Sequence, residues 1–262
     1  MTQVVRFERP PVRGVTLSVF FAQIPNLQVS HLSSLREQWR SDYPTTHEAP
    51  PRMPRFGDDD DELVLLPNEP WLFPYLTFAT SSGDRIVGVQ KDRFTLSWEF
   101  GEADDESRPS YPGYEHLRQE LDLRLGEFGA QVEREAGGTL TLMASDCRYR
   151  NVVEGVSAAD LQVGIATGWA GAQAGAHLLA ADWSGFRIHQ CSTEENNLCA
   201  TLISIEGDHD EDPTLVIYVD RDVSDVEDSA SLAGLDFAHT ELIKQFVACS
   251  NPALRERWGQ LA

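Results

Sequence analysis

The 262-residue chain has few cysteines and no long apolar run, and both absences restrict what it can be. Its four cysteines, Cys147, Cys191, Cys199 and Cys249, show no C-x-x-C spacing, which argues against a disulfide framework or a zinc finger. We expect reduced, mostly buried thiols, although Cys191 and Cys199 can also face each other across a hairpin. No apolar stretch approaches the roughly 20 residues of a transmembrane helix, and the N-terminus lacks a signal-peptide pattern. A soluble cytoplasmic protein is the expectation.

The best-marked catalytic motifs are also missing. The chain contains no G-x-S-x-G elbow, no glycine-rich phosphate loop, no dinucleotide-binding glycine pattern and no H-E-x-x-H. These absences exclude the enzyme classes that such motifs define, and we expect no cofactor. They leave open an enzyme that is built from less characteristic residues.

Positive charge is scarce. The 42 aspartates and glutamates outnumber the 21 lysines and arginines, and the formal net charge is −21. Nucleic-acid backbones and anionic membranes are bound through lysine and arginine, so we expect neither as a direct partner. The acidic segments at 58–62, 102–106 and 206–212 instead permit a basic protein partner. The alternative is that the charge serves only solubility.

Hydrophobic residues make up 41% of the chain, and their clearest pattern predicts a hairpin followed by a helix. Apolar and polar residues alternate over 93–100, which predicts a strand with one buried face, paired with a strand over 85–90. Over 111–135 apolar residues recur every three or four positions, which predicts an amphipathic helix on that face. Gly126 and Gly129 lie inside this helix, and we expect them to allow close packing on the sheet. The apolar positions of the second strand are Phe94, Leu96, Trp98 and Phe100.

The order of the predicted elements indicates the fold class. In each half of the chain several strands precede one long helix, the second of which covers 236–249. This order favours an α+β fold over the alternating units of a parallel sheet. We expect two similar halves, 1–137 and 138–262, each a curved antiparallel sheet closed by a long helix; the two can also form one continuous domain. The strands expected outside the central hairpin cover 14–22, 63–66, 74–80, 139–144, 147–153, 177–183, 185–191, 198–206 and 214–220.

Residues spread along the whole chain resemble a sporadically distributed, uncharacterised family of bacterial proteins of similar length. That family opens with F-x-x-P-P, has a central block V-Q-x-D-R-F-x-x-x-W followed by Y-P-x-Y, and ends with a Y-x-N strand and a helix with His, Phe and Trp in order. Family members usually carry Asn-Trp-Arg where this chain has Ser97-Trp98-Glu99, so a site served by that Asn and Arg would be missing here. The family's patchy distribution resembles that of defence or toxin–antitoxin genes. The matching residues are Phe7, Pro10, Pro11, Val89, Gln90, Asp92, Arg93, Phe94, Trp98, Tyr111, Pro112, Tyr114, Tyr149, Asn151, His239, Phe246 and Trp258.

Polar and aromatic residues around the central hairpin are the first candidate site. Gln90, Arg93, Trp98 and Tyr111 are close in sequence, and together they predict a ligand pocket at the mouth of the sheet in which Arg93 binds an anion. The alternative is structural, with Arg93 paired to Asp92 and Gln90 bonded to backbone groups.

Two histidines provide the remaining candidates. His239, near the start of the last helix, can act as a general base if Asp236 or Asp220 orients it, or can simply pack on the sheet. His209, between Asp208 and Asp210, can help to bind a divalent cation, although the run is also typical of a solvated turn, and we expect no metal.

Three functions are compatible with these observations. The first is a non-enzymatic acidic protein, antitoxin-like or defence-associated, that docks a basic protein partner. The second is a small-ligand sensor with a pocket between sheet and helix, and the third is an unrecognised enzyme that uses His239. The first is the hypothesis that the charge and the missing catalytic motifs favour.

Overall fold

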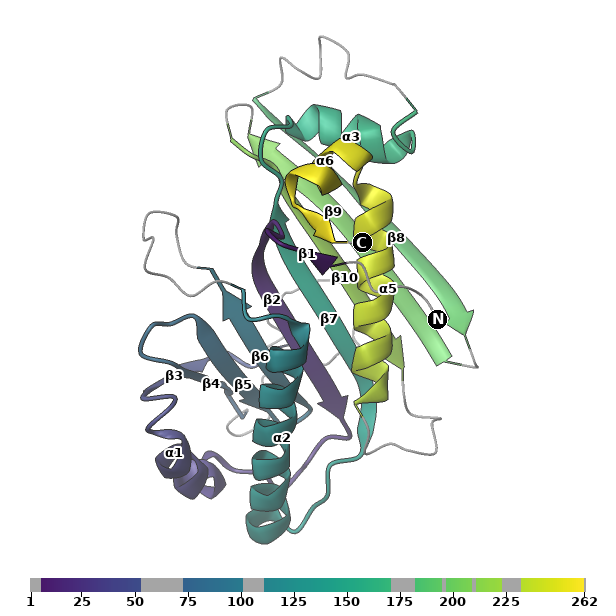
Figure 1. The fold of residues 1–262 in the computed structure, drawn as a ribbon. Helices are drawn as coiled ribbons and strands as arrows, with labels where there is room; N and C mark the ends of the chain where they lie inside the picture. The colour runs from purple at the N-terminus through teal and green to yellow at the C-terminus, as the bar shows by residue number, and fades with distance from the viewer. Residues whose placement is uncertain are drawn as a thin grey trace. The chain divides into compact units, whose positions relative to one another are not determined.

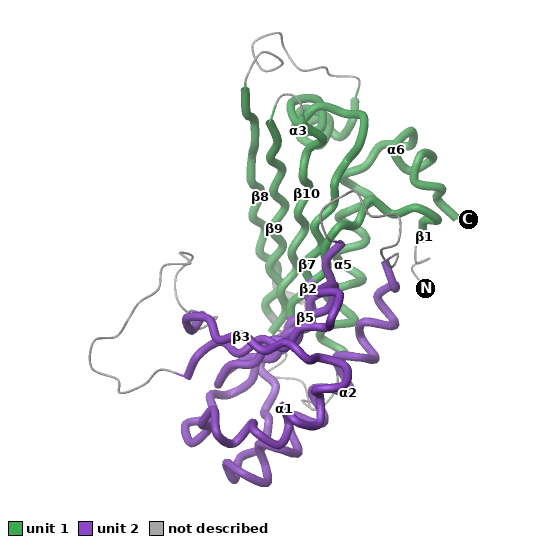
Figure 2. Tube along the Cα trace, turned by 90° about the vertical axis from the view of Figure 1, so that its left-hand side faces the viewer, with its two compact units in different colours: residues 1–15, 146–222, 233–262 green, residues 16–145, 223–232 purple. Residues whose placement is uncertain are grey.

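The computed structural model describes residues 6–52, 73–100, 111–170, 182–194, 197–208, 211–222 and 232–261. Its strands form a nine-stranded sheet in the order β3-β4-β5-β6-β2-β7-β10-β9-β8, and a separate two-stranded sheet of β1 and β11 (Figure 1). Two compact units can be distinguished (Figure 2): unit 1 comprises residues 1–15, 146–222 and 233–262, and unit 2 comprises residues 16–145 and 223–232. The long strands β2 (Val12–Phe21) and β7 (Leu142–Val152) each contribute residues to both units.

The predicted fold class is wrong. Two similar halves, each a curved antiparallel sheet closed by its own long helix, were expected, but nine strands form a single antiparallel sheet. The cause lies in β2 and β7, which are neighbours in the strand order and are 10 and 11 residues long. A strand carries hydrogen-bonding groups on both edges, so strands from early and late parts of the sequence join one ladder. The expected boundary at 137/138 precedes β7, whereas the two compact units divide inside β2 and β7.

In unit 2 the predicted hairpin is confirmed. β5 (Arg85–Gln90) and β6 (Arg93–Glu99) pair antiparallel with Gln90 opposite Arg93, so that Lys91 and Asp92 alone form the turn. β4 pairs with the other edge of β5, and the short strand β3 pairs with β4. The predicted strand over 63–66 lies outside the described residues. The remaining elements before the hairpin are the 3-10 helix η1 (Val29–Leu32), α1 (Ser33–Trp39), β3 (Thr45–Ala49) and β4 (Tyr75–Ala79).

The long helix α2 (Tyr114–Ala136) packs against β6, as the sequence predicted. It ends where Gly137 adopts a left-handed conformation with φ of 67°, which favours glycine. The ring of Phe128 lies 5.6 Å from that of Phe94 and 5.9 Å from that of Phe21, measured between centroids. The apolar face of β6 and the stripe of α2 therefore form the core of unit 2. Phe94, Leu96 and Trp98 are each at most 1% exposed.

In unit 1 the hairpin of β8 (Trp183–Glu194) and β9 (Asn197–Asp208) continues into β10 (Thr214–Asp222), and all these pairs are antiparallel. Alternate residues of β9 are buried, namely Cys199, Thr201, Ile203 and Ile205. The helix α5 (Ala233–Cys249) packs on β10, while α3 (Ala158–Ala166) contacts β8 and β9. Helices therefore cover one face of this part of the sheet (Figure 1).

The first and last described residues of the chain pair in unit 1. β1 (Arg6–Phe7) pairs antiparallel with β11 (Gln260–Leu261), which follows α6 (Pro252–Arg257). The ring of Phe7 lies 5.6 Å from that of Phe246 and 5.9 Å from that of Trp258. Within the described ranges, no helix combines the length and the apolar character needed to cross a membrane.

Candidate functional site

The side chains of Gln90 and Arg93 are both occupied by contacts within unit 2. The amide of Gln90 accepts a hydrogen bond from the backbone N–H of Arg52 at 2.8 Å and donates one to its carbonyl at 2.9 Å. The guanidinium of Arg93 donates to both carboxylate oxygens of Asp92, each at 3.2 Å, and lies over the ring of Phe20. Both side chains are less than 10% exposed. These are the contacts that the structural alternative predicted.

Trp98 and Tyr111 lie together, but at the opposite end of the hairpin. Their ring centroids are 5.3 Å apart, and Trp98 is 1% exposed. Trp98 pairs with Arg85, whereas Arg93 pairs with Gln90 at the turn of the hairpin. Trp98 and Arg93 are five positions apart on β6, and side chains an odd number of positions apart point to opposite faces of a strand. The structure therefore brings Gln90 close to Arg93 and Trp98 close to Tyr111, but does not bring the four predicted ligand residues together.

The space between α2 and the sheet, where a ligand pocket was a possibility, is filled by side chains. Phe128 contacts both Phe94 and Phe21 there, and the ring of Trp39 lies 5.2 Å from that of Phe78. All five aromatic side chains are at most 2% exposed. This region is a packed core, which favours stability over ligand binding.

The predicted metal site cannot be assembled from the described residues. His209 and Asp210 lie outside them, and Asp208 is the exposed last residue of β9. Among the residues that the structure describes, no cluster of three His, Cys, Asp or Glu side chains could hold a metal ion.

His239 lies on α5 against β7, with its ring 5.9 Å from that of Tyr149. Burial lowers the pKa of its imidazole from 6.5 to about 4, against the opposing effect of the Asp236 carboxylate. The imidazole is therefore neutral at pH 7. A general base works best when its pKa is near the operating pH, so this environment is unfavourable for that role.

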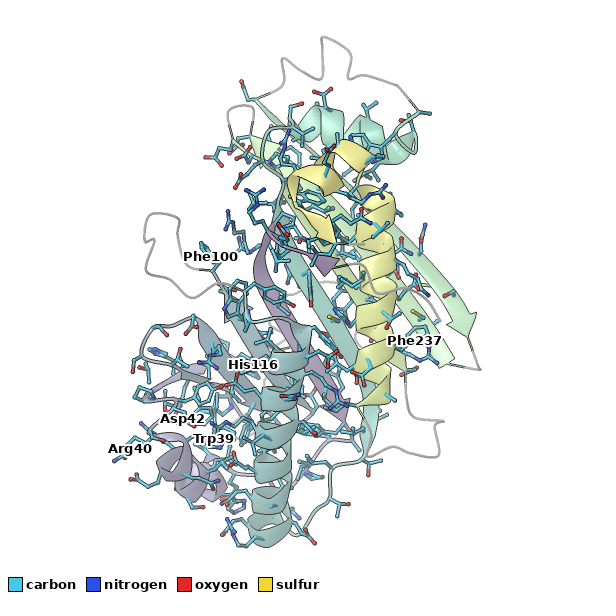
Figure 3. The ribbon with its side chains drawn as sticks, viewed as in Figure 1. Trp39, Arg40, Asp42, Phe100, His116 and Phe237 are labelled. Atoms are coloured by element: carbon cyan, nitrogen blue, oxygen red, sulfur yellow. The ribbon has the colours of Figure 1, made fainter. Side chains whose placement is uncertain are left out.

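A polar network ties α1, α2 and β5 together in unit 2 (Trp39 and Asp42 are labelled in Figure 3). The carboxylate of Glu120 accepts hydrogen bonds from the Tyr43 hydroxyl and from Arg85, the latter at 3.0 Å. Burial, followed by this carboxylate, raises the pKa of the Tyr43 hydroxyl, so it remains protonated.

The second part of this network centres on Arg124 of α2. Its guanidinium donates to Asp42 and, at 3.1 Å, to Glu127, whose carboxylate also accepts from the Trp39 indole at 2.6 Å. Because its charged groups are paired with one another, the network is suited to holding helices together rather than to chemistry.

The cysteines do not form a reactive pair. All four are free; burial raises the pKa of the Cys147 thiol well above its usual range and that of Cys249 to about 12. Cys191 is exposed and pairs with Ala200, whereas Cys199 is buried and pairs with Ser192. Paired residues share a face, so Cys191 and Cys199 point to opposite sides of the sheet and cannot bond across the hairpin.

A cavity of about 400 Å³ lies in unit 1, where the β8–β9 hairpin meets α5. Its lining is mainly polar, with hydroxyl, amide and carboxylate groups. Burial favours the neutral form of Glu241, but hydrogen bonds from Lys244 at 2.9 Å and Gln245 at 2.8 Å outweigh this effect and lower the pKa of the carboxyl. The carboxylate of Glu241 is therefore ionised at neutral pH, and Lys244 is its ion-pair partner. The lining residues are Gln190, Cys191, Ser192, Cys199, Thr201, Glu241 and Gln245.

This cavity was not predicted from the sequence. One indication was present: Gln190 and Thr201, which pair across the hairpin, are polar at positions that face the covered side of the sheet. The sequence did not show where α5 lies, because its cavity residues Glu241 and Gln245 are about 50 residues along the chain from those of the β8–β9 hairpin.

The chain matches no protein-family model, no curated protein and no solved structure. The resemblance to a bacterial family therefore stays a prediction from its motifs, and the function has to be inferred from the site and the charge.

Proposed function

We propose that this protein is a non-enzymatic binding protein that docks a basic protein partner on its acidic surface. The observation that carries this proposal is the net charge of −21. A large negative potential attracts a cationic surface, accelerates the encounter and disfavours acidic partners. An antitoxin-like or defence-associated factor is a role that such binding would serve.

The ion pairs support this proposal, because they engage many of the few cations. Arg85 pairs with Glu120, Arg93 with Asp92, and Lys244 with Glu241. Cations that are paired internally add little positive potential to the surface, so the surplus of carboxylates dominates it. Glu115 and Glu133, for example, are exposed on α2.

The alternatives have less support. A small-ligand sensor would need space between sheet and helix, where Phe94 and Phe128 are in contact instead. An enzyme that uses His239 as a base would have to work with an imidazole whose pKa is about 4.

The proposal is tested by affinity capture. The tagged 262-residue chain is exposed to extract of its native host at low salt, and a disordered acidic polypeptide of equal net charge serves as the control bait. We expect a basic protein that is retained by the folded chain, not by the control, and that is released as salt is raised, because screening weakens exposed ion pairs. Recovery of no specific partner at low salt, or of an acidic one, would refute the proposal.

A further inference from the structure

The strand β8 has a long free edge. It is 12 residues long and ends the strand order, and no strand among the described residues pairs with its outer side (Figures 1 and 2). Between Asp182 and Glu194 it contains neither proline nor carboxylate. At the other end of the strand order, β3 has only 5 residues and is flanked by Pro44 and Pro50. Short length and flanking proline protect an edge against pairing, and β8 has neither protection.

A free edge offers backbone hydrogen bonds to an extended segment. Alternate residues of β8 direct their N–H and C=O groups away from β9, and another strand can add there. In such complexes the main-chain bonds provide affinity, whereas pockets for alternate side chains provide specificity.

The cavity of unit 1 lies beside this edge and supplies such a pocket. Gln190 and Ser192 of β8 line it, together with Glu241 of α5. A strand added to β8 would direct every second side chain to the face of the sheet that α5 covers.

We propose that β8 accepts an extended strand of the basic partner, with one arginine or lysine side chain in this cavity next to Glu241. The inference rests on the proposed function and adds to it a place and a mode of binding. The carboxylate of Glu241, the amide oxygens of Gln190 and Gln245 and the hydroxyls of Ser192 and Thr201 can all accept hydrogen bonds. Glu241 already accepts from Lys244 and Gln245, but a carboxylate has about four acceptor sites, so a guanidinium or ammonium group can donate to it beside them. Hydrogen bonds of this kind, between charged groups, are among the strongest in proteins.

A peptide experiment tests strand addition directly. The probe is a synthetic peptide of alternating valine and arginine, roughly nine residues long, about the length of a strand. Two derivatives carry N-methyl groups, one on the arginine amides and the other on the valine amides. In a strand added to β8, either the arginine or the valine backbone N–H groups point toward β8, and the other set points away. Methylation of the set that points toward β8 removes hydrogen bonds, so we expect that derivative to bind at least about tenfold more weakly and the other to bind almost unchanged. Binding that is driven by charge alone would treat both derivatives alike.

Protein variants test the cavity. Glu241→Gln removes the charge and keeps the shape, and we expect it to weaken binding of the unmodified peptide about tenfold. Glu206→Gln is the matched control: it makes the same change of charge on β9, where register and burial place Glu206 on the opposite face. We expect the control to bind like the native protein, and circular dichroism of both variants checks that they are folded.

Each other outcome overturns the inference. No binding of the peptide, equal effects of the two methylated derivatives, or equal effects of the two variants would exclude strand addition with a cation in the cavity. A dimer in sedimentation whose formation protects the β8 amides from hydrogen exchange would show that a second copy occupies the edge. The proposed function would survive these results if host capture still recovered a basic protein, and it fails separately if capture recovers none.

Discussion

Two glycines in the middle of α2 have different surroundings. A Cβ added at Gly129 would lie 3.3 Å from Leu140, whereas one added at Gly126 would meet no atom within 4 Å. Close packing on the sheet, which we expected for both, is found at neither position: the neighbour of Gly129 is Leu140, which precedes β7. Nothing in the described structure explains why Gly126 is glycine.

This difference predicts the effect of alanine at each position. Gly126→Ala should stabilise the protein by about 1 kcal/mol, because alanine restricts the unfolded chain and meets no obstacle in the helix. Gly129→Ala should gain less, since Leu140 has to move. Urea titration of both variants measures the difference, and an equal gain at the two positions would contradict the described packing.

The buried imidazole of His239 predicts a loss of stability in acid. Its pKa falls from 6.5 to about 4 on folding, so between these values the unfolded chain binds a proton that the folded chain does not. Stability from the burial of neutral His239 is therefore intact above pH 6.5 and is lost as the pH falls toward 4. The full effect is on the order of 3 kcal/mol.

The measurement is the free energy of unfolding at pH 7 and pH 5 for the native chain and for His239→Asn. The native chain should lose more stability than this variant. His116→Asn, at an exposed position on the outside of α2 (Figure 3), is the control and should lose as much as the native chain. Equal losses in all three proteins would show that His239 titrates normally in the folded state.

At the scale of elements, Glu120 connects α2 both to β5 and to the segment after α1. Glu120→Gln should destabilise the protein by about 1–2 kcal/mol, because it weakens the bonds from Tyr43 and Arg85 in a half-buried setting. Glu37→Gln is the control: its pair with Arg40 is 66% exposed on both sides and should contribute less than about 0.5 kcal/mol. Chemical denaturation measures both changes.

A second experiment distinguishes the loss of the Tyr43–Glu120 hydrogen bond from the loss of the Glu120 charge. In a double-mutant cycle, Tyr43→Phe and Glu120→Gln should together cost less than the sum of the single changes, since the first removes the donor of a hydrogen bond whose acceptor the second weakens. Additive effects would mean that the two side chains act independently.

At the scale of the whole molecule, the net charge of −21 predicts how binding depends on salt. The association rate with the captured basic partner should fall by roughly an order of magnitude or more when ionic strength rises from about 0.02 to 0.5 M, while the dissociation rate changes less. Surface plasmon resonance over a salt series measures both rates. An association rate that is independent of salt would show that charge does not guide this encounter.

The pattern of residues was sufficient to predict the central hairpin, the long helix that packs on it and the net charge. Alternation over 93–100 and the stripe over 111–135 identified the β5–β6 hairpin, the long helix and their shared core, because residue periodicity fixes which side chains share a face. It did not determine how the candidate residues are grouped: Gln90 and Trp98 are eight positions apart in the chain but belong to opposite ends of the hairpin.

Which distant segments of the chain meet depends on its three-dimensional packing. The pairing of strands from both parts of the chain made one sheet where two were expected, and α5 placed Glu241 beside Ser192 and Thr201. Hydrophobic patterns mark the face that a strand buries, but any strand with a free edge can pair with any other. Register and packing across the whole chain select the partner, and they also leave β8 with one edge open.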